Sequence, residues 1–165
     1  MRVLGIDTSL RSTGVGIVER DGARMVSLAH ETLKVGRSAP HSECLQVIHA
    51  GVEGVIGRFA PEAVSIEGVF HCRNVRTAVI LGQARGAAIA VCAIAGIPVF
   101  EYSPRKVKQA VCGSGAAHKE QVGRMLMKLL MLGELLPDDE SDALALAVCH
   151  LNSLSSIREL APKPL

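Results

Sequence analysis

The sequence predicts an α/β domain in which a five-stranded mixed sheet is flanked by helices, and two observations lead to this prediction. Three apolar, β-branched segments follow one another at the start of the chain, with turn residues such as Asp21-Gly22 between them. This pattern is typical of consecutive antiparallel strands. From about residue 40 onward, helical patterns alternate with short apolar segments. Because parallel strands must be joined by crossovers, this second part is expected to add parallel strands to the same sheet.

The strands are expected at residues 2–7, 14–20, 25–35, 62–67 and 97–102. Five helices are expected at residues 40–59, 74–96, 104–111, 118–131 and 139–154. The first helix has apolar positions three and four residues apart, which is the spacing of an amphipathic helix. The second is apolar on nearly all sides, which predicts that it is buried. We expect a single domain over residues 1–156 and a flexible tail over residues 157–165.

Size and composition are those of a soluble cytoplasmic protein. The chain has 165 residues, of which 48% are hydrophobic and 21% are charged. It contains no uninterrupted apolar stretch of the roughly 18 residues that a membrane helix requires. Charged residues are scattered through the first 20 positions, unlike a signal peptide. The five cysteines include no CxxC pair, so neither a disulfide framework nor a zinc site is indicated.

The charge is distributed unevenly along the chain. Residues 73–128 contain nine Lys and Arg and only two acids, a net charge of +7, although the whole chain carries +2. The remaining residues therefore carry −5. This asymmetry favours a polyanionic partner on one face, and the alternative is that the basic side chains only solvate helix surfaces.

Four acidic residues are placed where they could meet. Asp7 and Glu67 each end a predicted strand, and two adjacent central strands would bring them together at one edge of the sheet. Asp139 and Asp142 are three residues apart, so they share one helical face, which continues through apolar residues and points inward. For this second pair alone, the alternative is that acids in a first helical turn complement the helix dipole, with Asp138 as the N-cap.

A cluster of four carboxylates needs neutralisation. Two carboxylates about 4 Å apart repel by roughly 4 kcal/mol at an effective dielectric constant of 20. Divalent cations remove this repulsion, and oxygen ligands select Mg²⁺ or Mn²⁺ over zinc. Two such ions, roughly 3.5–4 Å apart, would activate a water and stabilise the departing 3′ oxygen of a phosphodiester. The acids therefore predict hydrolysis of a nucleic-acid backbone.

Several stretches in one order across residues 3–150 resemble the RuvC family of crossover junction endodeoxyribonucleases, which have a ribonuclease H-like fold. These stretches are LGIDTSLRSTGVGIV, SIEGVF, LGQARGAA, VFEYSPRKVKQAVCGSGAAHKEQV and DESDALALAVCH. The resemblance implies a homodimer that binds a four-way Holliday junction and nicks two strands of like polarity with Mg²⁺ or Mn²⁺. It also implies a possible RuvAB branch-migration partner. By this resemblance, the catalytic metal-binding acids are Asp7, Glu67, Asp139 and Asp142.

The chain departs from the family pattern at two places. Thr8-Ser9 replaces the usual Pro-Gly after the first acid, which puts the shape of that turn in doubt. Gly68 stands where a larger polar residue is common, and this change could alter how bases beside the cut are read.

The resemblance also identifies residues that would hold DNA. Lys108 and Lys119 match basic positions near the scissile phosphate. Phe70 would wedge against an unstacked base at the branch point, the alternative being a side chain packed on the core. Further basic residues extend the same positive charge, each of which could equally be a solvated surface residue: Arg76, Arg105, Lys106, Arg124 and Lys128.

Small residues share one face of the predicted helix at 74–96, namely Gly82, Gly86 and Ala90. Core packing would explain them, and so would the contact between two subunits of a dimer. Two other functions compete with the nuclease. One is an actin-like or sugar-kinase nucleotide-binding lobe, although 165 residues supply only one of the two lobes that such proteins close over ATP. The other is a junction-binding protein that has lost catalysis.

Overall fold

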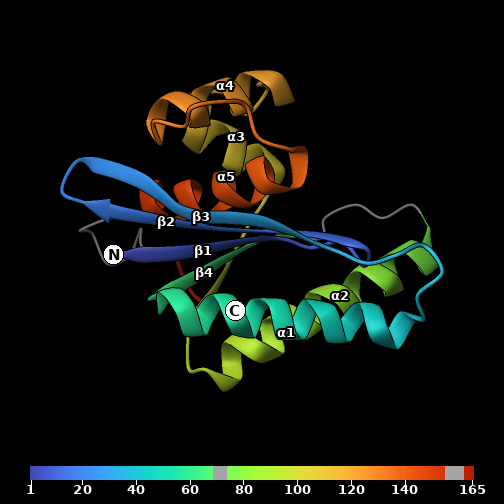
Figure 1. The fold of residues 1–165 in the computed structure, drawn as a ribbon. Coiled ribbons are helices and arrows are strands. Elements are labelled where there is room, and N and C mark those ends of the chain that lie inside the picture. The colour runs from blue at the N-terminus through green and yellow to red at the C-terminus, as the bar shows by residue number, and fades with distance from the viewer. Residues whose placement is uncertain (69–73, 155–161) are drawn as a thin grey trace.

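A twisted five-stranded sheet forms the middle layer of the molecule, with two helices on one face and three on the other (Figure 1). The computed structural model describes residues 1–68, 74–154 and 162–165. The strands are β1 (Arg2–Asp7), β2 (Ser12–Asp21), β3 (Arg24–Lys34), β4 (Ala63–Glu67) and β5 (Val99–Tyr102). The helices are α1 (His41–Phe59), α2 (Val75–Ile94), α3 (Pro104–Cys112), α4 (Lys119–Leu129) and α5 (Asp138–Ser153).

The predicted fold class and element order are confirmed, and each predicted boundary lies within two residues of the observed one. The spatial order of the strands is β3-β2-β1-β4-β5. The β1–β2 and β2–β3 pairs are antiparallel, whereas β4 runs parallel to β1, and β5 to β4. The sheet is therefore mixed, as the change from hairpins to crossovers along the sequence predicts.

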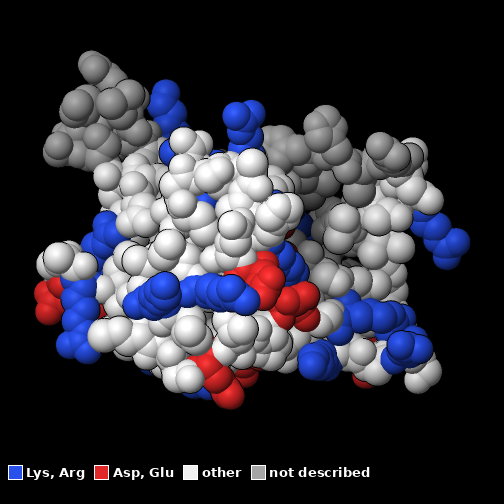
Figure 2. Space-filling view, turned by 90° about the horizontal axis from the view of Figure 1, so that it is seen from above, with Lys and Arg blue, Asp and Glu red and all other residues white. Residues whose placement is uncertain are grey.

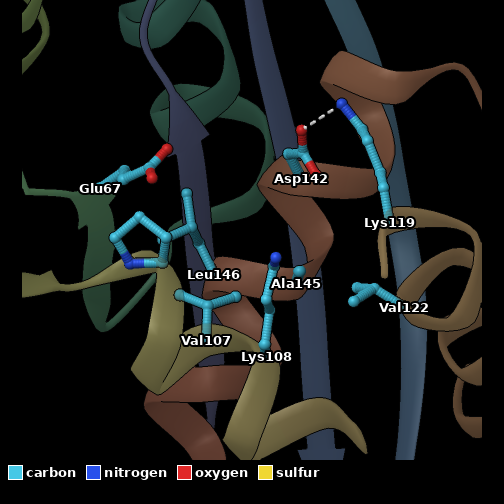
Figure 3. A pocket seen from close by; sticks show the side chains of 9 residues that line it. Glu67, Val107, Lys108, Lys119, Val122, Asp142, Ala145 and Leu146 are labelled. Atoms are coloured by element: carbon cyan, nitrogen blue, oxygen red, sulfur yellow. Dashed lines mark ion pairs between the residues drawn. The ribbon is translucent and has the colours of Figure 1, made fainter. Parts of the chain in front are cut away.

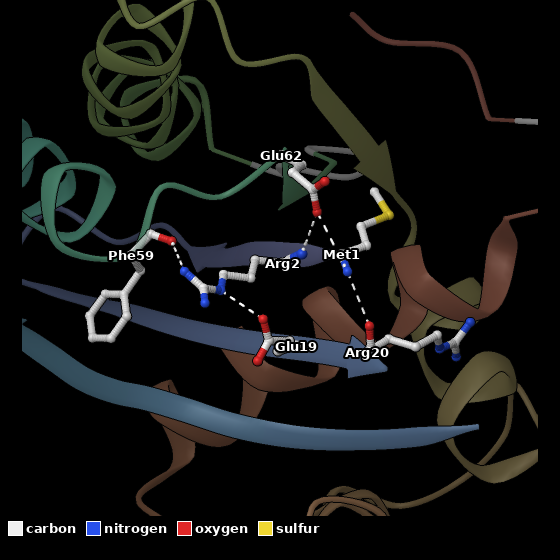
Figure 4. Close-up of polar contacts among 6 residues, drawn as sticks. All are labelled: Met1, Arg2, Glu19, Arg20, Phe59 and Glu62. Carbon is white, nitrogen blue, oxygen red and sulfur yellow. Dashed lines mark hydrogen bonds and ion pairs between the residues drawn. The ribbon is translucent and has the colours of Figure 1, made fainter. Parts of the chain in front are cut away.

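Polar contacts around the start of the chain set the register of the central strands (Figure 4). Arg2 Nε donates to Glu19 on β2 at 2.8 Å, and its Nη1 donates to the Phe59 carbonyl at 3.1 Å. The backbone N–H of Arg2 donates to Glu62 Oε2 at 2.7 Å. These contacts tie β1 to β2 on one side and to the end of α1 and the segment between α1 and β4 on the other. Since a slip of one residue would turn every side chain to the opposite face, the register decides where Asp7 points.

Alternation along β1 separates two apolar cores. Leu4 and Ile6 belong to the core beneath α1 and α2, whereas Val3 belongs to the core beneath α3, α4 and α5. Gly5 faces α5, because a Cβ atom there would lie 1.8 Å from the carbonyl oxygen of Ala143. Asp7 has the same parity as Val3 and Gly5, so it lies on the α5 face of the sheet.

Glycines in the central strands let α5 approach the sheet closely. A Cβ atom on Gly14 would lie 1.9 Å from the Asp139 carbonyl oxygen, and one on Gly16 would lie 2.7 Å from the Leu144 side chain. Together with Gly5, these glycines leave the surface of β1 and β2 without side chains where α5 crosses it. The helix backbone can therefore lie against the strands without intervening side chains.

Helix α2 is buried on one side only, and the prediction that it is buried all round is wrong for the chain by itself. Ala84, Ala88, Val91 and Cys92 are buried, and the helix packs against α1. On the outer side, Val75 is 79% exposed, Val79 is 53% exposed and Ile94 is 81% exposed. The helix is also long and apolar enough to cross a membrane by length and composition. The exposure of apolar residues on the outer side of α2 therefore needs an explanation.

Candidate active site

Two of the four predicted acids lie side by side at the end of the parallel strands. Ile6 pairs with Ile66 in the register, and Asp7 and Glu67 are the next residues on β1 and β4. Glu67 has the same parity as Ser65, whose hydroxyl donates to the Leu146 carbonyl of α5 at 2.8 Å. Both acids therefore face α5.

Helix α5 brings the other two acids to the same edge. Pro137 occupies its N-cap position and Asp138 is the first helical residue, so Asp138 is not the N-cap. Asp139 and Asp142 follow in its first turns, where the helix backbone touches Gly14 of β2. Glu67 and Asp142 line the same pocket, and the charges of Asp142, Glu67 and Asp139 all act on Asp7.

Burial and mutual repulsion raise the pKa values of the two strand acids. Burial is the largest influence on Asp7, followed by the charges of Asp142, Glu67 and Asp139, and together they raise its pKa to about 7. Burial and then Asp142 raise the pKa of Glu67, while Lys119 acts in the opposite direction. A positive charge placed among these carboxylates would relieve the repulsion.

The α5 acids are already engaged by neighbouring side chains. Asp142 Oδ2 lies 2.9 Å from Lys119 Nζ, and Lys119 also lies 3.3 Å from Asp138 Oδ2. The Ser12 hydroxyl donates a hydrogen bond to Asp139 Oδ2. Among the described residues, no three His, Cys, Asp or Glu side chains are close enough to hold a metal ion as they stand. The oxygen donors suit Mg²⁺ or Mn²⁺, and one of them, Asp142 Oδ2, is occupied by Lys119.

A pocket of about 200 Å³ opens beside Glu67 and Asp142 (Figure 3). Its wall is apolar and includes Val107, Val122 and Leu146. The carboxylates and two lysines, Lys108 of α3 and Lys119 of α4, complete its lining. The two lysines that were predicted to lie near the scissile phosphate thus share one pocket with two of the predicted acids.

The sequence at each end of α3 places Lys108. Ser103 is the N-cap, its side chain accepts a hydrogen bond from the Lys106 backbone N–H, and Pro104 follows it at the first helical position. Gly113 ends the helix in the left-handed region with φ 75°, a conformation that glycine adopts without strain. Val107 and Val111 bury the inner side of α3, so Lys108 lies at the edge facing the pocket.

The other basic residues predicted to bind DNA lie outside this pocket. Arg105 packs its side chain against Gly115, and Arg76 lies exposed in the first turn of α2. Lys106 is exposed on α3. Arg124 forms an ion pair with Glu120 at 2.6 Å and, with Lys128, lines a separate open groove. Figure 2 shows Lys and Arg side chains spread across the α3 and α4 side of the molecule, around a central group of acids.

Two predicted features of the chain, the Thr8-Ser9 turn and Gly68, lie at or next to the strand ends. The turn after Asp7 is closed by the buried Thr13, whose hydroxyl donates to the Ser9 carbonyl at 2.6 Å and accepts from the Ser9 N–H at 3.3 Å. The Gly68 N–H donates to the Tyr102 carbonyl at 3.0 Å, so Gly68 continues the β4–β5 pairing. Phe70 lies outside the described residues.

Two sets of residues that shape the site are not among the predicted site residues. The first set is Ser12 and the strand glycines. Gly14 and Gly16 are two residues apart within a predicted strand, and this spacing was the available signal, because glycines in a strand often mark a close approach of another backbone. The second is a clamp on α5. Glu140 lies 2.6 Å from His30 Nδ1 and accepts a hydrogen bond from Thr32 at 3.2 Å, both on β3. No local pattern predicts this clamp, since 110 residues separate His30 from Glu140.

A ribonuclease H-like sheet that ends in converging carboxylates, with lysines beside them, defines the class of divalent-metal-dependent nucleases. The comparisons with known proteins make this class specific. The family model of the crossover junction endodeoxyribonuclease RuvC matches residues 3–150. The chain therefore belongs to the RuvC family, which sets aside the actin-like alternative.

Relatives and solved structures agree with this membership. The chain is 50% identical over 153 residues to the RuvC of Trichlorobacter lovleyi, covering 93% of this chain and 86% of the relative. It is 47% identical over 161 residues to the RuvC of Pelobacter propionicus, covering 98% and 92%. The structure of T. thermophilus RuvC in complex with a Holliday junction substrate superposes with a TM-score of 0.91 at 39% identity, covering 100% of this chain and 99% of that one.

Proposed function

We propose that this protein resolves four-way DNA junctions in recombination and repair by hydrolysing one phosphodiester in each of two symmetric strands. The observation that carries the proposal is the meeting of Asp7 and Glu67 with the acidic first turns of α5, beside Lys108 and Lys119. A phosphodiester needs both features, because its negative charge must be held while a water molecule attacks it. The RuvC with a TM-score of 0.91 was solved with such a junction.

The four acids are the proposed ligands of two Mg²⁺ or Mn²⁺ ions: Asp7, Glu67, Asp139 and Asp142. When bound, the ions would supply Lewis acidity to the attacking water and to the departing 3′ oxygen. The chain's own contribution is orientation. Ser12 holds Asp139 through its hydroxyl, and the clamp of His30 and Thr32 on Glu140 holds the helix turn between Asp139 and Asp142.

The lysines and the other basic residues would position the DNA. Lys108 and Lys119 border the pocket next to the acids, which supports contacts to the phosphate that is cut and to its neighbour. Phosphate contacts set the register of a protein on DNA and make its binding sensitive to salt. Contacts to more distant phosphates are proposed for Arg76, Arg105, Lys106 and Arg124. For Phe70 the proposed role is a wedge at the branch point.

A homodimer would match the two-fold symmetry of a four-way junction and give paired cuts. The outer face of α2 supports this assembly. It exposes Val79 and Ile94, and no described atom beyond the local turns of the helix lies within 4 Å of the Cβ position of Gly82 or Gly86, so a second helix could approach closely there. Burial against a second subunit would also explain why α2 is apolar nearly all round.

The remaining parts of the proposal follow from the DNA substrate. The protein would act in the cytoplasm, where bacterial DNA lies, and the RuvAB complex is a possible partner. Residues 1–156 would form the single nuclease domain and residues 157–165 its tail. Within the described part of that tail, the Leu165 N–H donates to the Val99 carbonyl on β5 at 2.8 Å.

The test compares Asp7→Asn with the wild-type protein on a labelled four-way junction. The variant keeps the shape of the side chain and the basic surface, so it should bind the junction in a gel shift but fail to cut it with Mg²⁺. Asp21→Asn, at the exposed last residue of β2, is the matched control and should cut normally. Normal cutting by Asp7→Asn would overturn the metal site. Binding without cutting by the wild-type protein would instead support a junction-binding protein that has lost catalysis.

A further inference from the structure

Lys119 pairs with one of the proposed metal ligands, Asp142, and with the neighbouring Asp138. Its Nζ lies 2.9 Å from Asp142 and 3.3 Å from Asp138, and its charge acts on both Asp7 and Glu67. In Figure 3 a dashed line joins its Nζ to Asp142, whereas Lys108 of α3 has no such line. Among the described residues, Lys108 forms no ion pair although it lines the same pocket.

We propose that Lys119 is a built-in counter-cation for Asp142 in the metal-free protein, and that DNA phosphate draws it away, so that metal and junction bind cooperatively. This inference rests on the proposed nuclease function and adds a regulation of the same site. Before DNA arrives, the ammonium group competes with the metal for Asp142. Once a phosphate accepts the ammonium, Asp142 is free to bind the metal.

Electrostatic repulsion favours this exchange. Two like unit charges 4 Å apart repel by about 4 kcal/mol at an effective dielectric constant of 20, and a divalent ion doubles this value. An ammonium group 2.9 Å from Asp142 therefore opposes a divalent ion bound to the same carboxylate. A phosphate beside the site offers the ammonium a second anion of the kind that Lys binds as a point charge.

The fold lets Lys119 move without disturbing the helix that carries it. Lys119 is the first residue of α4, and its side chain is half-exposed. The helix start is held independently, because the His118 N–H donates to Gln121 Oε1 at 2.8 Å. Val122 and Leu126 anchor α4 in the core. Only the flexible side chain has to turn, over a distance that its four-carbon stem can span.

Thermodynamic linkage makes the effect reciprocal. If DNA raises the affinity for metal, then metal must raise the affinity for DNA by the same factor. Such a device would keep metal affinity low on the free enzyme and raise it at the junction. Replacing Lys119 by an uncharged residue would remove the competition and strengthen metal binding to the DNA-free protein.

The decisive experiment measures Mn²⁺ binding without DNA, by calorimetry, to the full chain and to Lys119→Met and Lys108→Met. Lys119→Met should bind Mn²⁺ at least about fivefold more tightly than wild type, the lower end of typical coupling between sites. Lys108→Met, which removes a charge from the same pocket but no ion pair, should remain close to wild type. An unchanged or weaker affinity of a folded Lys119→Met would overturn the inference.

A second readout avoids any dependence on the variant's folding. In wild-type protein with ¹⁵N-labelled lysine side chains, the Lys119 Nζ signal should be protected from exchange and should lose that protection on addition of Mg²⁺, while the Lys108 signal changes little. A Lys119 signal unaffected by saturating Mg²⁺ would contradict the exchange. Neither measurement requires DNA cleavage, so failure here would leave the outcome of the Asp7→Asn test intact.

Discussion

His150 of α5 is a buried titratable side chain that the proposed chemistry does not use. Its Nδ1 lies 2.8 Å from the Tyr102 hydroxyl, and its ring centroid lies 4.3 Å from that of Phe100. Burial lowers its pKa to about 4 from the usual 6.5. The neutral imidazole therefore packs between α5 and β5, and protonation would place an uncompensated charge in the core.

This burial predicts an acid-sensitive contribution to stability. Between pH 6.5 and pH 4 the unfolded chain binds a proton at His150 and the folded protein does not, so the free energy of unfolding falls as the pH falls. The contribution is fully present above pH 6.5 and about 2 kcal/mol of it should be lost between pH 7 and pH 5.

Urea unfolding of wild type and His150→Gln at the two pH values measures this loss. The raised pKa values of Asp7 and Glu67 act in the opposite direction, because these acids gain protons in the folded protein first. They are present in both proteins, so the difference between the two isolates the histidine. An equal response of both proteins to pH would contradict the prediction.

At the scale of elements, the contact between α5 and the central strands positions the site. The Asp139 backbone lies against Gly14, and Ser12 and the β3 clamp on Glu140 hold the same helix turn. The acids on α5 therefore keep their positions only while the helix lies directly on the strands. A side chain inserted between them would move the helix end that carries two of the four acids.

Gly14→Ala tests this dependence. The new methyl group would meet the Asp139 carbonyl, and relief of this overlap should cost roughly 1–3 kcal/mol of stability. Cleavage should fall along with stability, since Asp139 is displaced. Gly54→Ala, on the exposed side of α1 with no described atom within 4 Å of its Cβ, is the control. It should stabilise the protein by roughly 0.5–1 kcal/mol and leave cleavage unchanged.

Thermal unfolding and junction cleavage, measured on both glycine variants, would separate these outcomes. A Gly14→Ala protein as stable and as active as wild type would show that α5 can move away from the sheet at no cost.

At the scale of the whole molecule, the two faces of the sheet have different tasks. Helices α3, α4 and α5 build the pocket and the basic surface, whereas α1 and α2 cover the opposite face (Figure 1). The outer side of α2 presents apolar residues to solvent in the isolated chain. In the proposed dimer, the outer side of α2 contacts the same side of α2 in the second subunit. Each of the two active sites would then cut one strand of the junction.

Gly86→Glu should weaken that dimer, because it would place a bulky charge at a position open to close approach. Sedimentation at micromolar concentration should show dimers for wild type and monomers for the variant. Met131→Glu, at an exposed apolar residue outside α2, should leave the assembly unchanged. A monomeric wild-type protein, with or without DNA, would count against the proposed dimer.

Local patterns determined a large part of this protein. The order of strands and helices, the strand ends at Asp7 and Glu67, and the shared helical face of Asp139 and Asp142 all follow from residue spacing, because backbone periodicity is a local property. The motifs carried by these elements were also sufficient to indicate the RuvC family.

Tertiary structure alone decided how the elements meet. The approach of α5 onto strand glycines, the clamp of β3 on Glu140 and the pairing of Lys119 with Asp142 join residues that are 23 to 138 positions apart. The exposure of one side of α2 likewise follows only from its packing. An apolar helix sequence does not distinguish burial in the core from burial against another subunit. Contacts between distant residues depend on how whole elements pack, and the local spacing of residues does not determine that packing.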